Sequence, residues 1–232
     1  MHSGSVVAVF SGIRSLCRSN TLMNFDLTAF AKECGVAEPE KFAQKAELLR
    51  DIVLEANNSF NLTRITDPVE FMVKHVADSL AIGRYFPEEI TAAKRVADLG
   101  CGGGFPTLVL ALAYPHLQVT GIDSTGKKVR FVQETADKLG LGNVNTVHAR
   151  VEELNRKKEF IRQFDIVTAR AVAQGKILAK YASNFPVSGG AFIFYKTPNQ
   201  AAEDLQTLNW QCSEEYDLPL DMGTRVFLYH KI

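Results

Sequence analysis

The junction between an apolar run and a cluster of glycines constrains this chain more than any other feature. Residues 95–99 form a short, mainly apolar segment, and a helix is predicted to start at about Pro106. Between them lie four glycines, at Gly100, Gly102, Gly103 and Gly104. Glycine permits a tight turn and lets a ligand approach the backbone closely. In an open parallel sheet, ligands bind beyond the end of a strand that turns into a helix in this way.

The rest of the pattern predicts an α/β fold. Strands are expected at 95–99, 118–122, 143–148, 165–168, 191–195 and 225–230. Helices are expected at 106–113, 127–139 and 176–185. Strands that alternate with helices imply a mostly parallel sheet with helices on both of its faces.

The N-terminal part is predicted to be helical, without a strand. Apolar residues recur at helical spacing from about Glu40 to Asn57. A second helix is expected to start near Asp67, which can cap it, with Pro68 in its first turn. The buried stripe of this second helix is predicted to be Val69, Val73, Val76 and Leu80.

Three segments are expected along the chain: a tail at 1–25, a helical extension at 26–92 and the main domain at 93–232. The tail holds five serines and two arginines but no acidic residue. We interpret it as a disordered stretch, or as sequence upstream of a natural start at Met23. The alternative is that residues 1–22 are a transit segment for an organelle.

The spacing of the glycines distinguishes between nucleotide-binding loops. Gly100, Gly102 and Gly104 form GxGxG, whereas the dinucleotide pattern GxGxxG requires glycine at position 105, where Phe105 stands. The Gly-Lys-Ser/Thr of a Walker loop is also absent. A pyrophosphate loop is therefore disfavoured, and with it a nicotinamide-dependent oxidoreductase.

An acidic residue supplies the second half of a nucleoside site. Asp123 ends the second predicted strand, 19 residues after Gly104, and a carboxylate there can accept hydrogen bonds from both ribose hydroxyls. S-adenosylmethionine is a nucleoside ligand without a pyrophosphate and fits both features. Asp98, just before the loop, can hold the loop or the amino group of the methionine part. A lone glycine loop is often only a turn and a lone aspartate often only a cap, but the combination favours a methyltransferase.

Composition excludes several other classes. The 26 basic residues balance 26 acidic ones, which argues against charge-driven disorder and against a globally basic nucleic-acid binder. No apolar run reaches the roughly 18 residues of a membrane span. The four cysteines form no CxxC pair and lie near no spaced histidine cluster, so no metal site and no disulfide framework are expected.

Several further pieces of sequence occur in one order. They are Asn61-Leu62-Thr63 with Asp67-Pro68, Lys74-His75 with Asp78-Ser79-Leu80, Asp98 to Pro106 with its Gly-Phe-Pro, and Asp123-Ser124 with residues 126–131. Shorter matches follow at 151–153, 164–165 and 170–171. With these residues the chain, from about Asn58 onward, resembles the RsmG (GidB) family. Members of that family are bacterial methyltransferases that modify N7 of a guanine in 16S ribosomal RNA.

The resemblance implies a class I S-adenosylmethionine-dependent methyltransferase fold. This fold is Rossmann-like, with a mostly parallel seven-stranded sheet and helices on both faces. The catalytic domain would be 93–232, extended by the N-terminal helices. The family pattern implies cofactor contacts at Gly100 and Phe105, at Val151 and Glu152, and at Arg170, beside the residues chosen above. The expected cofactor site is therefore Asp98, Gly100, Gly102, Gly104, Phe105, Asp123, Val151, Glu152 and Arg170.

The sequence departs from the family pattern at three places. Cys101 stands where Ser or Thr is usual, Thr107 where Gly is usual, and Tyr195-Lys196-Thr197 where Leu-Lys-Gly is common. The first two change the volume of the loop, so they bear on the tightness of cofactor binding. Thr107 can instead contribute a hydroxyl at the start of the helix.

No catalytic base is expected, because guanine N7 already carries a free lone pair and methyl transfer can rest on positioning. The candidates for a direct role are Arg170 and His75. A guanidinium at Arg170 can bind the methionine carboxylate or an RNA phosphate, and a structural salt bridge is the alternative. His75 and Asp78 lie one turn apart and either border the acceptor pocket or form a surface ion pair with Lys74.

A neutral chain must bring basic residues together locally to bind RNA. The expected RNA contacts are Lys127, Lys128, Arg130, Lys196 and Arg64. The expected partner is 16S rRNA or the small ribosomal subunit, bound by a monomer in the bacterial cytoplasm, or in an organelle if 1–22 is a transit segment. Two alternatives stay open: a methyltransferase with a small-molecule or protein acceptor, and a non-catalytic RNA-binding protein on the same fold.

Overall fold

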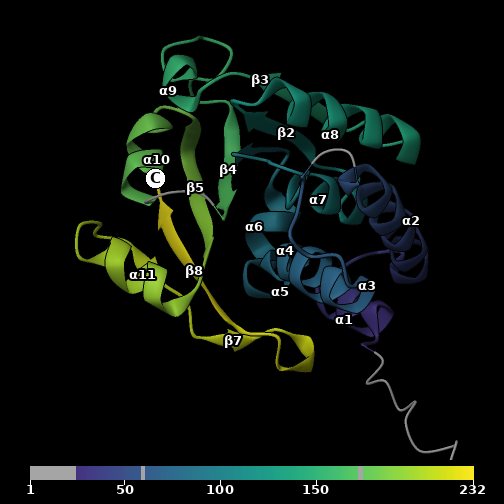
Figure 1. Cartoon of the computed structure of the whole chain (residues 1–232). Helices are drawn as coiled ribbons and strands as arrows, with labels where there is room; N and C mark the ends of the chain where they lie inside the picture. The colour runs from purple at the N-terminus through teal and green to yellow at the C-terminus, as the bar shows by residue number, and fades with distance from the viewer. Residues whose placement is uncertain (1–24, 59–60, 172–174) are drawn as a thin grey trace, which may run out of the picture.

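The computed structural model describes residues 25–58, 61–171 and 175–232, and its centre is a mixed sheet with helices on both faces (Figure 1). Within these residues, seven of the eight strands follow the order β3-β2-β1-β4-β5-β8-β6, and β7 pairs with β8. The first five strands run parallel, whereas β8 is antiparallel to β5. The strands are β1 (Arg95–Leu99), β2 (Gln118–Asp123), β3 (Val144–His148), β4 (Phe164–Arg170), β5 (Pro186–Lys196), β6 (Gln211–Cys212), β7 (Tyr216–Asp217) and β8 (Thr224–Lys231).

Two groups of helices cover the sheet. On one side lie α7 (Thr107–Ala113) and α8 (Gly126–Leu139), with the N-terminal helices packed over them, and on the other side lie α9 (Val151–Leu154), α10 (Gly175–Tyr181) and α11 (Pro198–Leu205) (Figure 1). A short 3-10 helix, η2 (Pro219–Asp221), precedes β8. The N-terminal elements are α1 (Leu27–Glu33), α2 (Pro39–Asn57), α3 (Pro68–Phe71), the π-helix η1 (Met72–Ala77), α4 (Asp78–Leu80), α5 (Ile82–Tyr85) and α6 (Pro87–Ala92).

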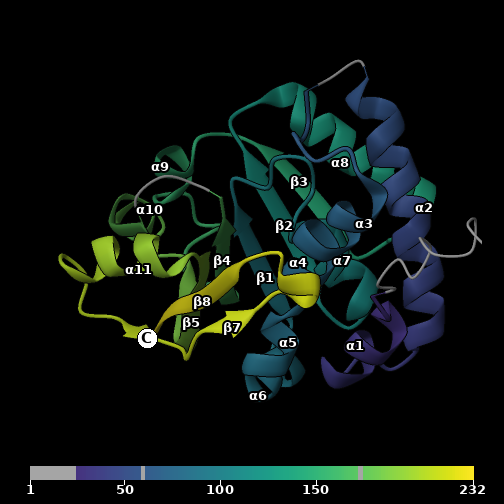
Figure 2. The same cartoon turned by 60° about the horizontal axis from the view of Figure 1, so that its bottom comes forward.

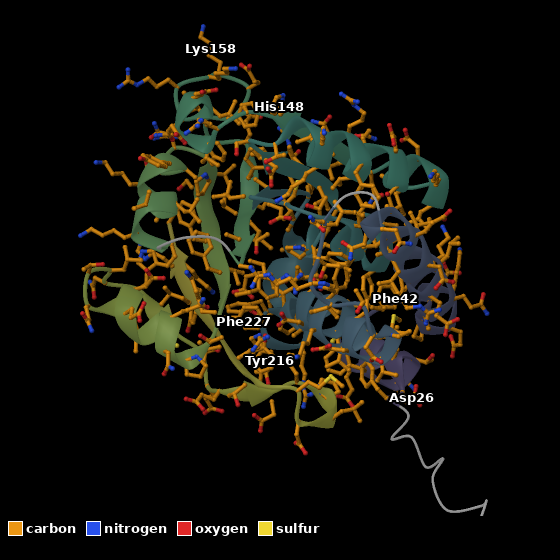
Figure 3. All side chains as sticks on the ribbon, viewed as in Figure 1. Asp26, Phe42, His148, Lys158, Tyr216 and Phe227 are labelled. Carbon is orange, nitrogen blue, oxygen red and sulfur yellow. The ribbon has the colours of Figure 1, made fainter. Side chains whose placement is uncertain are left out.

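Side chains alternate between the two faces along each strand, as the pleat requires. In β1, Val96 lies in the buried cluster beneath the N-terminal helices, and Leu99 lies in the cluster beneath α9 and α10. Phe42 of α2 and Phe227 of β8, both labelled in Figure 3, belong to the same first cluster. The N-terminal helices therefore share a core with the sheet.

The predicted elements are present, with changes at their ends. Every expected strand occurs, and the segment expected at 165–168 extends to Arg170. Asp67 caps α3 by accepting from the backbone N–H of Glu70, and no strand precedes Arg95 in the described residues. The prediction that Val69 belongs to the buried stripe of the second helix is wrong, because this residue is 38% exposed. The proposed tail lies outside the described residues except for Phe25.

The C-terminal hairpin lies against the N-terminal helices. Figure 2 shows β7 beside α5, and there Tyr216 stacks on Tyr85 with ring centroids 4.6 Å apart. Tyr195 of β5 donates its hydroxyl hydrogen to the carbonyl of Ser79, at 2.7 Å. These contacts join β7 to α5 and β5 to α4. No helix among the described residues is long and apolar enough to cross a membrane.

Candidate cofactor and acceptor site

A cleft of about 640 Å³ opens at the carboxyl ends of the parallel strands. Its volume falls within the roughly 300–1,000 Å³ that is typical of small-molecule sites. The glycine loop forms its floor, α9 and α10 supply one wall, and His75 and Leu62 of the N-terminal extension contribute to the lining. Seven of the predicted cofactor residues line it: Gly100, Gly102, Phe105, Asp123, Val151, Glu152 and Arg170.

The loop is held against the end of β2. The backbone N–H groups of Gly100 and Cys101 both donate to the carbonyl of Ile122. Oδ2 of Asp123 accepts from the N–H of Gly102 at 3.0 Å, and Oδ1 accepts from the N–H of Thr125 at 2.8 Å. Each carboxylate oxygen retains a second lone pair. Asp123 is thus oriented by the backbone and can still accept hydrogen bonds from ribose hydroxyls.

Gly104 and Asp98 lie beneath the cleft rather than in its lining. Asp98 is fully buried, and its Oδ2 accepts from both the backbone N–H and the hydroxyl of Thr107, at 3.2 and 2.5 Å. The prediction that Thr107 places a hydroxyl at the helix start is therefore confirmed. Oδ1 of Asp98 is buried without a hydrogen-bond partner among the described residues. An unsatisfied buried carboxylate oxygen costs free energy, and a cationic ligand group such as a methionine ammonium would relieve that cost.

Burial also sets the protonation of Asp98. Removal from water raises its pKa from 3.8 to about 6, against the opposing effect of the hydrogen bonds from Thr107. The folded protein therefore holds this proton more tightly than the unfolded chain does. The stabilising contribution of the group is full below about pH 4 and is lost as the pH rises through about 6.

This difference in pKa gives a measurable prediction for Asp98→Asn. Relative to the wild type, the variant should gain free energy of unfolding, on the order of 3 kcal/mol, as the pH rises from about 4 to about 7. Urea unfolding of both proteins across this range measures the difference. A difference that stays constant with pH would contradict the burial of a charged carboxylate at this position.

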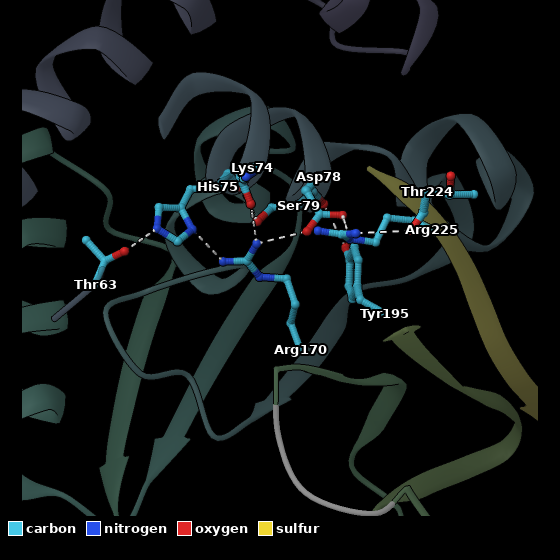
Figure 4. Close-up of polar contacts among 9 residues, drawn as sticks. All are labelled: Thr63, Lys74, His75, Asp78, Ser79, Arg170, Tyr195, Thr224 and Arg225. Carbon is cyan, nitrogen blue, oxygen red and sulfur yellow. Dashed lines mark hydrogen bonds and ion pairs between the residues drawn. The ribbon is translucent and has the colours of Figure 1, made fainter. Parts of the chain in front are cut away.

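Arg170, at the end of β4, joins the cleft to the N-terminal extension (Figure 4). Its Nη1 donates to the carbonyl of Lys74 at 2.7 Å and to Oδ2 of Asp78 at 3.0 Å. Its Nη2 lies 3.0 Å from Nδ1 of His75, and the guanidinium carbon lies 5.6 Å from the ring centroid of Phe105. Arg170 both lines the cleft and forms a buried salt bridge, so the two interpretations of this residue are compatible.

These contacts fix the state of His75. A guanidinium only donates, so Nδ1 of His75 accepts and Nε2 carries the hydrogen, which it donates to the hydroxyl oxygen of Thr63 at 2.7 Å. Burial first, and then the charge of Arg170, lower the pKa of the imidazole to about 3. The ring stacks on Phe105 with centroids 4.6 Å apart. His75 is therefore a neutral, oriented part of the wall, and the surface ion pair with Lys74 does not form: Lys74 pairs with Glu70.

A π-helix positions these groups. Residues 72–77 form a wide turn between α3 and α4, and π-turns are frequent at functional sites. The carbonyl of Lys74 is bonded by Arg170, and that of His75 accepts from the hydroxyl of Ser79. The apolar pattern predicted only a regular helix here. Thr63 and Arg225, which complete the network, were missed as site residues because no local pattern links them to it.

Four of the five predicted RNA contacts lie at the surface or in the cleft, and the fifth is buried. Lys127, Arg130 and Arg64 are exposed, and Lys128 lines the cleft. The structure corrects the prediction that Lys196 contacts RNA. Its side chain is 6% exposed and pairs with Asp204 at 2.9 Å, so it belongs to the packing between β5 and α11.

The departures from the family pattern have structural roles. Cys101 is buried, and burial raises the pKa of its thiol, so it is a small packing residue beside Gly121 rather than a nucleophile. Thr197 caps α11 in a capping box with Gln200. Among the described residues, no group of three or more His, Cys, Asp or Glu side chains is arranged to hold a metal ion.

Comparisons with known proteins show the family of the chain. The GidB family model, described as rRNA small subunit methyltransferase G, matches residues 42–222, and so starts earlier than the resemblance noted above. The Ribosomal RNA small subunit methyltransferase G of Leuconostoc citreum (strain KM20) is 36% identical over 82% of this chain and 82% of that protein. The protein of the same name from Lysinibacillus sphaericus (strain C3-41) is 34% identical over 87% of each.

Solved structures support the fold. A putative O-methyltransferase from Klebsiella pneumoniae superposes with a TM-score of 0.56 at 15% identity, over 79% of this chain and 89% of that one. A predicted O-methyltransferase from Agrobacterium tumefaciens gives a TM-score of 0.51 at 18% identity, over 62% of this chain and 77% of that one. The fold is that of class I S-adenosylmethionine-dependent methyltransferases, and the chain belongs to the GidB family of rRNA small subunit methyltransferases G.

Proposed function

We propose that this protein transfers a methyl group from S-adenosylmethionine to N7 of a guanine in 16S rRNA of the small ribosomal subunit. The observation that carries the proposal is the composition of the cleft. A glycine loop and Asp123 form a nucleoside site, and a wall made by Arg170, His75 and Phe105 closes it on the side of the N-terminal extension. The nucleoside site suits the cofactor, and the wall borders the space left for an acceptor base.

The residues of the cleft fit the cofactor by their chemistry. Asp123 can accept from the ribose hydroxyls, Val151 and Glu152 can read the adenine edge, and the unpartnered oxygen of Asp98 can take the ammonium. S-adenosylmethionine supplies an electrophilic methyl group when it is bound. What the chain must add is the alignment of the acceptor with that group.

Guanine N7 is an acceptor atom with a free lone pair, so the chain needs no group to remove a proton. The state of His75 agrees with this requirement. Both ring nitrogens are engaged in hydrogen bonds and the imidazole is neutral. Rate enhancement then comes from orientation, which can supply up to about 7–11 kcal/mol.

The RNA surface is proposed to include Lys127, Lys128, Arg130 and Arg64. Lys127 and Lys128 lie in the first turn of α8, beside the loop, and the electrostatic field of a helix N-terminus also favours anions. The chain as a whole is neutral, so affinity for free RNA should be modest. We infer that a monomer acts on an accessible, partly assembled small subunit in the bacterial cytoplasm.

Neutralising this surface should weaken binding in a salt-dependent way. Replacing Lys127, Lys128 and Arg130 together by glutamine should reduce the slope of log affinity against log salt by about 2, because each lost phosphate contact removes about 0.7–0.9. The matched control is Lys138→Gln, exposed near the other end of α8 and about 15 Å away along the helix. Filter binding to small subunits at several salt concentrations measures the slopes, and equal slopes for both variants would exclude this surface.

The proposal is tested by offering labelled S-adenosylmethionine with alternative acceptors. Small subunits that lack the modification should take up label, whereas large subunits, free nucleosides and ribosomal proteins should not. Calorimetric titration should also show binding of S-adenosylmethionine and S-adenosylhomocysteine but not of NAD. Label in protein or in small molecules would favour the other acceptor classes, and binding of RNA without cofactor would favour a non-catalytic protein.

A further inference from the structure

Asp78 lies between two guanidinium groups that come from distant parts of the chain. Nη1 of Arg170 is 3.0 Å from Oδ2, and Nε of Arg225 is 3.4 Å from Oδ1. The side chain of Asp78 is only 4% exposed, and those of Arg170 and Arg225 are 11% and 21% exposed. Figure 4 shows the two arginines reaching the carboxylate from opposite sides. One buried anion is therefore shared by two cations.

The two arginines differ in their relation to the cleft. Arg170 lines it, whereas Arg225 is not among the lining residues. Arg225 otherwise donates to the backbone carbonyl of Thr224. Nearby, the hydroxyl of Tyr216 is buried without a hydrogen-bond partner among the described residues. The ion pairs of Asp78 therefore join Arg225 to Arg170 in the cleft wall.

Asp78 also determines how Arg170 faces the cleft. Nη1 is bonded to both the carboxylate and the carbonyl of Lys74, which fixes the plane of the guanidinium. That plane brings Nη2 to His75 and the guanidinium carbon over Phe105. A planar guanidinium donates its hydrogen bonds in fixed directions, so the orientation of the plane decides which groups it can bond. Without the carboxylate, the guanidinium would keep only its bonds to the carbonyl of Lys74 and to His75, and its plane would be less firmly held.

We propose that Asp78 and Arg225 are positioning residues of the methyltransferase: Asp78 holds Arg170 in the cleft wall, and Arg225 of the C-terminal hairpin holds Asp78. The proposal rests on the proposed function for its activity readout. Through Arg225, the β7–β8 hairpin would help to orient the wall of the cleft, although no residue of the hairpin lines the cleft. Truncation or distortion of that hairpin would then act on the reaction through one carboxylate.

The test compares Asp78→Asn with a matched control. Asp165→Asn changes a carboxylate that accepts from the backbone N–H groups of Lys94 and Arg95 at the opposite edge of the sheet. With small subunits as acceptor, Asp78→Asn should lower kcat at least about tenfold and leave KM for the subunit within about twofold. Asp165→Asn should leave kcat unchanged.

A spectroscopic readout separates positioning from general loss of structure. In the wild type, Nδ1 of His75 accepts a hydrogen bond from Arg170. In Asp78→Asn and in Arg225→Met, the ¹⁵N signal of this nitrogen should move toward that of an unbonded imidazole nitrogen, and in Asp165→Asn it should not. An unchanged His75 signal in both site variants would overturn the proposal.

A double-mutant cycle tests the order of the chain of contacts. If Arg225 acts only through Asp78, the double variant Asp78→Asn/Arg225→Met should lose no more kcat than Asp78→Asn alone. Fully additive losses of kcat would contradict this order. Arg225→Lys should retain more activity than Arg225→Met.

If Asp78→Asn does not fold, the Arg225 variants and their His75 signals decide the question. If the wild-type protein fails to methylate small subunits, the proposed function fails, while the His75 signals and the affinity for S-adenosylhomocysteine still test the positioning roles.

Discussion

Replacing Arg170 by methionine should lower kcat/KM for small subunits at least about 100-fold, equivalent to about 2.7 kcal/mol of transition-state stabilisation. The substitution keeps much of the apolar length of the side chain but removes every hydrogen bond that it donates. Nδ1 of His75 would lose its donor, and Asp78 would remain buried with only the more distant Arg225. Removing one partner of a buried pair typically costs about 3–5 kcal/mol, so the free energy of unfolding should fall as well.

Two further variants make this result specific. Arg170→Lys keeps the charge but not the planar fork, so it should recover only part of the activity. Arg84→Met removes an arginine whose ion pair with Glu33 is exposed, and such pairs contribute about 0–1 kcal/mol. Steady-state kinetics and urea unfolding of the three variants measure both effects. Activity of Arg170→Met within about tenfold of the wild type would mean that the wall of the cleft does not depend on this residue.

Gly104→Ala should be the most damaging single change in the loop. Gly104 has a φ of +99°, and an added Cβ would lie 2.4 Å from Cδ1 and 2.9 Å from Cγ of Leu108, which is fully buried. Backbone strain of this kind costs about 1–3 kcal/mol, and forcing a packed core apart costs about 1–3 kcal/mol more. A loss of about 2–6 kcal/mol in the free energy of unfolding is therefore expected, together with weaker binding of S-adenosylhomocysteine.

The neighbouring glycine provides the control. At Gly103 an added Cβ would meet the carbonyl oxygen and Cβ of Leu62 at 3.6 and 3.7 Å, which are ordinary contacts. Gly103→Ala should therefore keep the free energy of unfolding within about 1 kcal/mol of the wild type. Urea unfolding of the two variants in parallel measures the difference. Equal stability of the two proteins would contradict the packing described for Gly104.

The parts of the fold that depend on local sequence could be predicted. The glycine loop, the strand before it and the helix after it are adjacent in the chain, so their pattern determines the turn. Asp123 could be placed because the carboxyl ends of neighbouring parallel strands meet at one edge. The helix at Pro68 carries its own cap and proline. In each case the interaction that matters lies within a few residues, or follows from the topology of a parallel sheet.

The rest of the site depends on contacts between distant segments. Arg225 lies 147 residues after Asp78 in the chain but contacts it in the fold, and no local sequence pattern indicates this contact. The π-turn at 72–77 differs from an α-helix by one residue per turn, a difference that the apolar spacing does not resolve. Lys196 ends β5 at the ligand edge, where an RNA-binding lysine could lie, but α11 brings Asp204 against it. That pairing becomes apparent only when α11 is placed in the fold.

The most direct measurement is the position of the transferred methyl group. Small ribosomal subunits lacking the modification are incubated with the purified protein and isotopically labelled S-adenosylmethionine, and nuclease digests of the RNA are analysed by mass spectrometry. The proposed function predicts one labelled 7-methylguanosine in 16S rRNA, lost in Arg170→Met. Label on another atom or in another molecule, or no transfer by a protein that binds the cofactor, would contradict it.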